Sequence, residues 1–515
     1  MRVWVGSIGA VILTLSCGDG GAGHGQSIND ITAEGGADDI DAAGGALVSS
    51  GGRGTPQGGT RATQQGGSTT LHTGGASGVL TSTNASERGG TSNITYHAGG
   101  SAEAGETGSG GERELPTGGG TTSTTGGQPG TVVSCAGALT FADPTLEYEV
   151  RKATGRTNGA LLAEDVAGLT TLQLARTGVS SLSGIECLRD LTVLELSDDP
   201  VMDLTPLSNA SELQELLLDG SSVSELAPIS HLPALKKLDL TRSSVFDITP
   251  LTTVTSLETL AISRISPGNM DAFLGLTNLR SLTADYCGID SLSALSELHQ
   301  LRELSLYHNI FTDIAPLAQL TTLEKLNLGE NWFTDISPLS ALDRLTELEL
   351  AFDTIPDITP LAALPQLRRL SIEGVQEIAD FTPISALRSL TELTVSYSGL
   401  DSTLPLVELT ALTKLKFSGG HLSELGPLAN LQGLTELVLT DNEISEVGPL
   451  SVLPLLSSLD LTMNKIRQIA PLAMTEALGP GDYLGIGFNH LDCQEQKQYL
   501  DALTQRGVQL FTDCE

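Results

Sequence analysis

Hydrophobic positions recur along most of this chain with a fixed period, and two consecutive units show the pattern most clearly. They read LRELSLYHNIFTDIAPLAQLTT at 301–322 and LEKLNLGENWFTDISPLSALDR at 323–344. Both units have leucine at positions 1, 4 and 6, asparagine at 9, Asp-Ile at 13 and 14, and Pro-Leu at 16 and 17. Self-similarity at a period of 22 residues predicts a solenoid, in which each unit packs on its two neighbours.

Fourteen such units follow one another, and almost all have the same length. They begin at Leu169, Leu191, Leu213, Leu235, Leu257, Leu279, Leu301, Leu323, Leu345, Leu367, Leu390, Leu412, Leu434 and Leu456. The unit at Leu367 has one extra residue, the last unit has about three more around 479–481, and a degenerate fifteenth unit, YLGIGFNHLDC, follows at 483–493. We expect these insertions in loops, where they leave the stacking intact.

The arrangement of leucines within a unit predicts a short strand followed by a turn. Leucines at positions 4 and 6 lie two apart, so they share the inward face of a strand while positions 3, 5 and 7 face outward. Stacked units then form one parallel sheet of about 65 Å at roughly 4.8 Å per strand. Positions 11, 14, 17 and 20 close the core from the other side. Proline at 16 suits the start of a helical turn, and the few remaining residues favour 3₁₀ turns over a long helix.

The motif LxxLxLxxNxIxDIxPLxxLxx resembles the leucine-rich repeat family, in particular its internalin-like 22-residue class, over roughly 138–515. The resemblance implies an α/β solenoid with a parallel β-sheet on the concave face, 3₁₀ turns on the convex face, and a cap at each end. It also implies that the concave face binds proteins. We therefore expect an N-terminal cap at 135–168, the repeats at 169–480, and a degenerate last repeat with a C-terminal cap at 481–515.

The two caps are also indicated by their own residues, because an open end of the array would expose leucines. In 141–155, Asp143 can be the N-cap of a helix that places Leu146 and Val150 on one face. A second helix is expected at 494–507. C-terminal caps of the resembled family are cross-linked, which implies a disulfide Cys493–Cys514.

The remaining cysteines have separate expected roles. Cys135 and Cys187 form a second candidate pair, which together with Cys493–Cys514 fits an oxidising, exported location. Cys287 occupies position 9 of its repeat and is expected to be a buried free thiol.

The first 134 residues have a different composition from the repeats. Residues 1–17 contain one arginine, a short apolar run and then Cys17, a pattern typical of a secretory signal and similar to the lipobox of bacterial lipoproteins. The resemblance implies acylation of Cys17, although Thr14 departs from the motif; the alternative is an ordinary signal peptide. Residues 18–134 hold 33 of the 58 glycines and have no apolar periodicity, which predicts a disordered tether about 60 Å in root-mean-square length.

The net charge of the chain and its lack of catalytic motifs reduce the number of functions that it could have. The formal charge is −35, of which −29 belongs to 135–515, and such an acidic surface disfavours nucleic acid and anionic membranes as partners. The charge can favour a basic partner or serve solubility alone. The histidines of the repeats are scattered over different positions: His231, His299, His308 and His421. We find no catalytic motif, metal cluster or cofactor-binding loop, and so predict no enzyme, metal or cofactor.

Residues that recur at the same position of successive repeats are expected to have structural roles. Aspartates at position 13 are expected to cap the following turn, not to bind cations: Asp203, Asp247, Asp313, Asp335 and Asp357. Asparagines at position 9 are expected to bond open backbone groups: Asn309, Asn331, Asn442, Asn464 and Asn489. Other repeats place Thr177, Ser221, Ser243, Cys287 or Asp353 there. Charges of alternating sign at position 3 are expected to pair between neighbouring strands.

Aromatic residues are only 4% of the chain, yet several gather near position 8 of the central repeats. The predicted binding residues are Tyr286, Tyr307, His308, Trp332, Phe352 and Tyr397. Equivalent positions stack along a solenoid, so these side chains should form a contiguous exposed patch of the kind that anchors interfaces. The alternative is that some of them pack against neighbouring loops.

The sequence therefore predicts an exported, lipid-anchored recognition or adhesion protein. We expect a monomer in the cell envelope, as an outer-membrane or cell-surface lipoprotein, attached to the membrane only through its N-terminal lipid. It would bind a protein ligand, and not nucleic acid, through the concave face and the aromatic residues. The alternative is a glycan-binding or structural envelope component.

Overall fold

The computed structural model describes residues 135–375, 378–475 and 477–514. The predicted signal sequence, its Cys17 and the predicted tether at 18–134 lie outside the described residues. Within the described ranges, no helix is both long and apolar enough to cross a bilayer.

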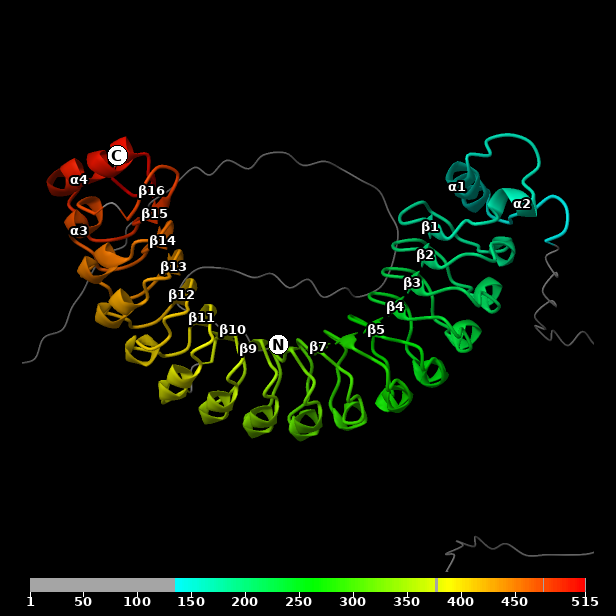
Figure 1. Cartoon of the computed structure of the whole chain (residues 1–515), viewed down its shortest axis with the longest axis horizontal. Coiled ribbons are helices and arrows are strands. Elements are labelled where there is room, and N and C mark those ends of the chain that lie inside the picture. The colour runs from blue at the N-terminus through cyan, green and yellow to red at the C-terminus, as the bar shows by residue number, and fades with distance from the viewer. Residues whose placement is uncertain (1–134, 376–377, 476, 515) are drawn as a thin grey trace, which may run out of the picture. The chain divides into compact units, whose positions relative to one another are not determined.

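The repeats form one parallel sheet of sixteen strands in chain order, which lines the inner side of a curved array (Figure 1). The strands are β1 (Thr171–Gln173), β2 (Val193–Glu195), β3 (Glu215–Leu217), β4 (Lys237–Asp239), β5 (Thr259–Ala261), β6 (Ser281–Thr283), β7 (Glu303–Ser305), β8 (Lys325–Asn327), β9 (Glu347–Ala351), β10 (Arg369–Glu373), β11 (Glu392–Ser396), β12 (Lys414–Ser418), β13 (Glu436–Val438), β14 (Ser458–Asp460), β15 (Tyr483–Gly485) and β16 (Gln509–Phe511). Equivalent repeat positions pair, as in Glu303, Lys325 and Glu347. The predicted solenoid fold is confirmed.

Short helices cover the outer, convex side of the array. They are the 3₁₀ helices η1 (Ile185–Cys187), η2 (Thr205–Leu207), η3 (Ala227–Ile229), η4 (Thr249–Thr253), η5 (Met270–Gly275), η6 (Ser293–Leu295), η7 (Ala315–Gln319), η8 (Ser337–Ala341), η9 (Thr359–Ala363), η10 (Thr382–Ala386), η11 (Leu404–Leu406), η12 (Gly426–Asn430) and η13 (Gly448–Val452), and one α-helical turn, α3 (Ala470–Ala473). Proline is the second residue of most of them. The predicted capping by position 13 is confirmed: Asp313 Oδ1 accepts from the Ala315 N–H at 2.8 Å, and Asp335 does the same for Ser337.

The leucines form one continuous core between the sheet and the convex helices. The residues at repeat positions 1, 4, 6, 11, 14, 17 and 20 are buried in nearly every repeat. Phe311 and Phe333 extend this core side by side, with ring centroids 6.0 Å apart. Because each repeat buries its apolar face only against its neighbours, stability is distributed along the array.

The predicted asparagine ladder joins neighbouring repeats inside the core. Asn309 Oδ1 accepts from the backbone N–H groups of Cys287 and Ile289 at 3.1 and 3.0 Å, and its Nδ2 donates to the carbonyls of Ala284 and Leu306 at 2.9 Å. Each such side chain therefore satisfies backbone groups of two repeats.

Two of the residues that replace asparagine at the ladder position have different chemistry. Cys287 is a buried free thiol, as predicted; its Sγ donates to the Ile262 carbonyl at 3.1 Å, and burial raises its pKa to about 11. Asp353 is also buried, and its Oδ1 accepts from the Asn331 N–H at 2.8 Å. Asp353 Oδ2 has no hydrogen-bond partner among the described residues, and burial raises the pKa of this carboxyl to about 8.

Both ends of the array are capped and cross-linked. Helix α1 (Pro144–Thr154) begins after Asp143, which accepts from the Thr145 N–H at 2.8 Å, and the short α2 (Ala163–Val166) leads into β1. Helix α4 (Cys493–Arg506) closes the other end. Both predicted disulfides, Cys135–Cys187 and Cys493–Cys514, are present. The sequence did not predict β16, which adds a last strand after α4.

Candidate binding surface

The residue at position 8, where the chain leaves the strand, has a left-handed backbone conformation along the whole array. The non-glycine residues with positive φ at this position are Arg176, Asp198, Arg242, Arg264, Tyr286, His308, Glu330, Phe352, Tyr397, Asp441, Met463 and Phe488. The repeats between them use Gly220, Gly374 and Gly419. We call this row of residues the rim. A left-handed conformation costs a non-glycine residue roughly 1–2 kcal/mol, so the rim keeps its side chains against a backbone preference for glycine.

The N-terminal part of the rim is ionic. Arg176 pairs with Asp198 at 2.9 Å, and Arg242 pairs with Asp198 at 3.1 Å and with Asp219 at 2.7 Å. Arg242 reaches Asp198 across two repeats because Gly220 lies between them, where a Cβ would overlap with the Asp198 carboxylate. These exposed pairs fix the side chains relative to one another and contribute little net stability.

The central part of the rim holds a cluster of stacked rings. The Arg264 guanidinium lies 4.6 Å from the centroid of the Tyr286 ring, and Tyr286 stacks on His308 with centroids 4.4 Å apart. Tyr307, one position earlier in its repeat, meets Tyr286 edge to face at 5.5 Å. The structure therefore brings three of the six predicted binding residues into contact and adds Arg264, which the sequence did not single out.

Glu330 closes this cluster on the side of the next repeat. Tyr307 Oη donates to one of its carboxylate oxygens, and His308 Nδ1 lies 2.5 Å from the other. Burial, and then the hydrogen bond to Glu330, raise the pKa of Tyr307. Burial acts to raise the pKa of Glu330 as well, but the hydrogen bonds with Tyr307 and His308 outweigh it, so the pKa lies below its usual value. Glu330 is thus a carboxylate that holds both rings in place.

The other predicted binding residues do not join this cluster. The Phe352 ring packs on Gly374 and the Tyr397 ring packs on Gly419, each in space that a Cβ would fill, and both side chains remain more than half exposed. Trp332 lies at position 10, is 68% exposed, and has no ring contact within the described part of the chain. The expected contiguous patch is therefore a row of separate ring contacts. A glycine 22 residues after an aromatic residue was the sequence signal for this packing.

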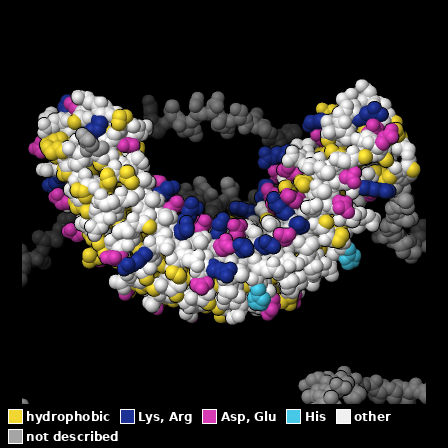
Figure 2. Space-filling view, viewed as in Figure 1, with side chains coloured by type: hydrophobic (Ala, Val, Ile, Leu, Met, Phe, Trp, Pro, Cys, Tyr) yellow, Lys and Arg dark blue, Asp and Glu magenta, His cyan; other side chains and the backbone are white. Residues whose placement is uncertain are grey.

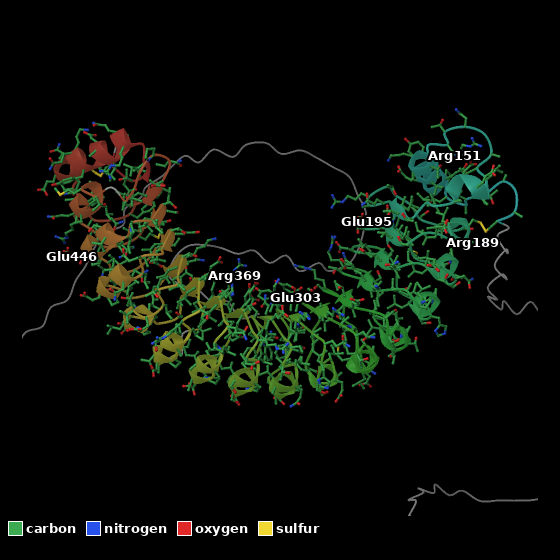
Figure 3. The ribbon with its side chains drawn as sticks, viewed as in Figure 1. Arg151, Arg189, Glu195, Glu303, Arg369 and Glu446 are labelled. Carbon is green, nitrogen blue, oxygen red and sulfur yellow. A yellow bond between two sulfur atoms is a disulfide. The ribbon has the colours of Figure 1, made fainter. Side chains whose placement is uncertain are left out.

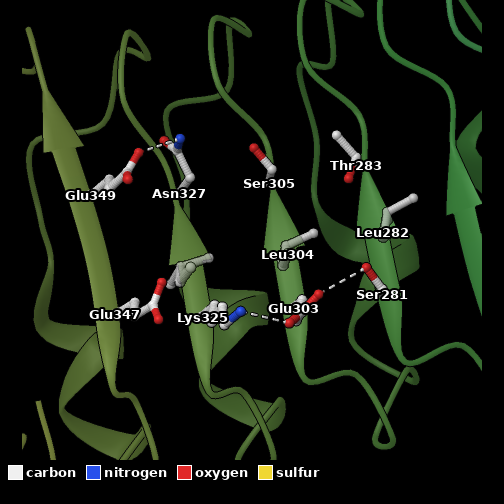
Figure 4. A pocket seen from close by; sticks show the side chains of 11 residues that line it. Ser281, Leu282, Thr283, Glu303, Leu304, Ser305, Lys325, Asn327, Glu347 and Glu349 are labelled. Atoms are coloured by element: carbon white, nitrogen blue, oxygen red, sulfur yellow. Dashed lines mark hydrogen bonds and ion pairs between the residues drawn. The ribbon is translucent and has the colours of Figure 1, made fainter. Parts of the chain in front are cut away.

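The concave face beside the rim holds a shallow polar depression of about 220 Å³ across β6 to β9 (Figure 4). Lys325 pairs with Glu303 at 2.9 Å, and Asn327 Nδ2 donates to Glu349 at 2.7 Å. Hydroxyl side chains such as Ser305, the carboxylate of Glu347, and leucines of the strands complete its lining. The predicted lateral pairing of position-3 charges is confirmed by the Lys325–Glu303 pair and by Arg369, whose Nε lies 3.1 Å from a carboxylate oxygen of Glu392.

Charge is not fully balanced on this face. Lys, Arg, Asp and Glu side chains lie next to one another along the inner edge (Figure 2), and Glu195, Glu303 and Arg369 mark that side in Figure 3. Although Glu349 is solvent-exposed, desolvation raises its pKa, and so do its negative neighbours, of which Glu347 and Glu373 are the strongest. Glu347 and Glu373 lie within 4.0 Å of Arg369 and Lys416, respectively, whereas Glu349 has no cationic partner among the described residues.

A search of the described residues finds no group of three or more His, Cys, Asp or Glu side chains that could hold a metal ion. The polar groups that gather on the concave face and the rim are arranged in rows, one residue from each repeat. Such an arrangement suits an extended ligand surface, because it offers many small contacts along a line.

Comparison with family models and with curated proteins finds no match. Solved structures do match. An internalin from Listeria monocytogenes is 27% identical, with 66% of this chain and 94% of that chain aligned at a TM-score of 0.54. A leucine-rich repeat protein from Leptospira interrogans is 20% identical over 68% of this chain and 97% of that chain, with a TM-score of 0.50. Together with the sixteen-stranded parallel sheet and its 3₁₀ turns, these similarities show that the chain has the leucine-rich repeat fold.

Proposed function

We propose that this protein is a recognition protein that binds a protein ligand through its concave face and rim. The observation that carries the proposal is the set of exposed, bulky side chains in the left-handed backbone conformation at position 8. Gly220, Gly374 and Gly419 stand at the same position in other repeats, so the fold accepts glycine there.

The energetics of the rim support a role outside folding. Each residue in a sparsely populated backbone region costs of order 1–3 kcal/mol. Phe352 is 58% exposed and Tyr397 is 52% exposed, so burial within the protein offsets only part of this cost. Exposed aromatic side chains of this kind are the usual anchors of protein interfaces, where a partner completes their burial.

We further propose that the protein acts outside the cytoplasm as an internalin-like lipoprotein. Disulfides in both caps persist in an oxidising compartment, and the similarity to an internalin supports a place at the cell surface. In this proposal Cys17 carries the lipid and residues 18–134 hold the monomeric repeat array away from the membrane. The Cys17→Ser variant is expected to leave the membrane fraction, and a variant that stays bound would contradict the anchor.

Site-specific crosslinking tests the proposed binding surface. A photoreactive phenylalanine analogue is placed at Phe352 on the rim, and at Phe246 as a control, because Phe246 is 63% exposed but lies outside the rim. Exposed to cell-surface extracts, the full chain should crosslink a distinct protein from position 352 and not from position 246. Equal crosslinking from both positions, or none from 352, would overturn the proposal.

A further inference from the structure

A small cavity near the starts of strands β6 to β9 is lined by cationic and neutral side chains. It has a volume of about 160 Å³, and its lining residues are Arg280, His299, Gln300, Arg302, Thr322 and Arg344. Arg280 and Arg302 directly precede β6 and β7, whereas the residues of the rim follow the strands. Because the strands are parallel, the cavity lies at the edge of the sheet opposite the rim.

The charge of this cavity differs from that of the rest of the chain. Asp and Glu outnumber Lys and Arg by 62 to 27, yet no carboxylate among the described residues lines the cavity. Threonine is the commonest residue at position 2, in six of the fourteen repeats, where two successive repeats have Arg280 and Arg302. Arg344 is the only lysine or arginine directly before a leucine that begins a repeat. The positive charge is therefore a property of these repeats and not of the motif.

Ion pairs use only some of the hydrogen-bond donors in the cavity. Arg302 Nη1 donates to Glu324 at 2.8 Å, and Arg280 Nε lies 3.5 Å from a carboxylate oxygen of Glu258. Arg344 forms no ion pair with any described residue. Since each guanidinium carries five N–H donors, most of the donors of these three arginines remain open to a ligand.

The nearby carboxylates reduce the positive charge of the cavity without cancelling it. Glu258 also lies 3.7 Å from Lys236, so two cations share this carboxylate. Glu297 lies 3.7 Å from His299. Asp343 precedes Arg344 in the sequence but does not line the cavity. An anion in the cavity would therefore contact guanidinium groups and no carboxylate.

The size of the cavity and the geometry of its donors indicate a single tetrahedral oxyanion. Pockets for drug-sized ligands measure roughly 300–1,000 Å³, so a cavity of about 160 Å³ suits one charged group. A guanidinium donates two parallel N–H bonds to a pair of oxygens, and three guanidiniums can serve more oxygens than the two of a carboxylate. A long polyanion would be repelled by the remaining surface, because residues 135–515 carry a charge of −29.

We propose that the cavity lined by Arg280, Arg302 and Arg344 binds one phosphate or sulfate group, as the free ion or as the terminal group of a larger ligand. This site is separate from the proposed function, because it requires neither the rim nor a protein ligand.

Calorimetry on the purified full chain tests the site with five titrants. They are sodium phosphate, sodium sulfate, glucose 6-phosphate, glucose 6-sulfate and sodium acetate, all at one constant ionic strength because salt screens exposed charges. Heat of binding is measured in place of thermal stability, since phosphate and sulfate also stabilise proteins by exclusion from their surface. At least one phosphate or sulfate titrant should bind about tenfold more tightly than acetate. Binding of the inorganic ions alone would assign the site to the free ion, and binding of an ester would assign it to a group on a larger molecule.

Matched variants assign this binding to the cavity. Arg344→Ala and Arg302→Ala should each weaken it by about tenfold, because each removes charge-assisted hydrogen bonds to the oxyanion. Arg368→Ala is the control: Arg368 is exposed, forms no ion pair with any described residue, and lies outside the cavity, so binding should be unchanged. Circular dichroism checks that each variant is folded. Absence of binding by all phosphate and sulfate titrants, equal binding of acetate, or equal effects of the three substitutions would overturn the inference.

Discussion

Replacing Asp353 with asparagine should stabilise the protein, and the gain should grow with pH. Asp353 occupies the ladder position that Asn331 fills in the preceding repeat, where Nδ2 donates to the carbonyls of Leu306 and Leu328 at 3.0 and 2.7 Å. A carboxylate cannot donate, and Asp353 Oδ2 is unpaired among the described residues. Burial raises the pKa of this carboxyl from 3.8 to about 8, so the native protein keeps it protonated at neutral pH.

Proton linkage gives the sign and size of the effect. Below pH 3.8 the folded and unfolded states both hold the proton, and ionisation costs nothing. Between 3.8 and about 8 only the folded state holds it, so the free energy of unfolding falls as pH rises. The slope is about 1.4 kcal/mol per pH unit, which accumulates to about 4 kcal/mol near neutral pH. The D353N variant does not ionise and avoids this loss.

Urea unfolding followed by circular dichroism measures the difference, with equal m-values required for the two proteins. The D353N variant should gain little near pH 4 and several kcal/mol near pH 7. Asp357→Asn is the matched control in the same repeat. Hydrogen bonds from Thr359 lower the pKa of Asp357, so the stability that its carboxylate contributes to the folded state is present above the usual pKa and is lost as pH falls. A D353N gain that is equal near pH 4 and pH 7 would refute the protonated buried carboxyl.

Three further outcomes follow from single contacts. Gly374→Ala should lower the free energy of unfolding in urea by about 1–2 kcal/mol, because φ is +69° and the new Cβ overlaps the Phe352 ring. Gly426→Ala, which has open space around its Cβ, should cost far less, and equal losses would contradict the strain at Gly374. Loss of the Cys135–Cys187 disulfide should lower the free energy of unfolding by about 4 kcal/mol and loss of Cys493–Cys514 by about 3 kcal/mol, because the first closes a loop of 52 residues and the second a loop of 21. Urea unfolding of Cys187→Ser and Cys514→Ser measures the two losses, and the reverse order would contradict the dependence on loop length. Glu330→Gln should lower the pKa of Tyr307 toward the usual value, seen in the ultraviolet difference titration against the parent protein, and an unchanged titration would exclude the hydrogen bond as a cause.

The repeat pattern predicted the fold because each part of it has one physical solution. Leucines two apart on a strand must face the same way, and Asp-x-x-Pro must cap and begin a turn, so β7 and η7 follow directly from 301–322. The ladder role of Asn309 and the buried thiol of Cys287 follow from their shared position 9.

The details of the rim could not be predicted in the same way, because they depend on pairs of residues in different repeats. Whether Phe352 lies free or packs on the next repeat is decided by Gly374, and whether Arg242 reaches Asp198 is decided by Gly220. A motif that treats position 8 as variable hides both effects. The left-handed backbone there is also invisible in the sequence, since its residues include arginine, tyrosine and phenylalanine, which rarely adopt it.

Three unfavourable features of this protein meet in the repeat that begins at Leu345, and their combination supports the proposed binding surface. The buried carboxyl of Asp353 directly follows the strained and exposed Phe352, and the uncompensated charge of Glu349 lies on the same strand, β9. A solenoid can carry such costs in its middle, because central repeats are packed on both sides while terminal repeats are packed on one. Selection for stability alone would place asparagine and glycine at these positions, as other repeats of the same chain do. The combination of a buried carboxyl, a strained ring and an unpaired carboxylate in this one repeat supports the proposal that its surface is kept for contact with a ligand.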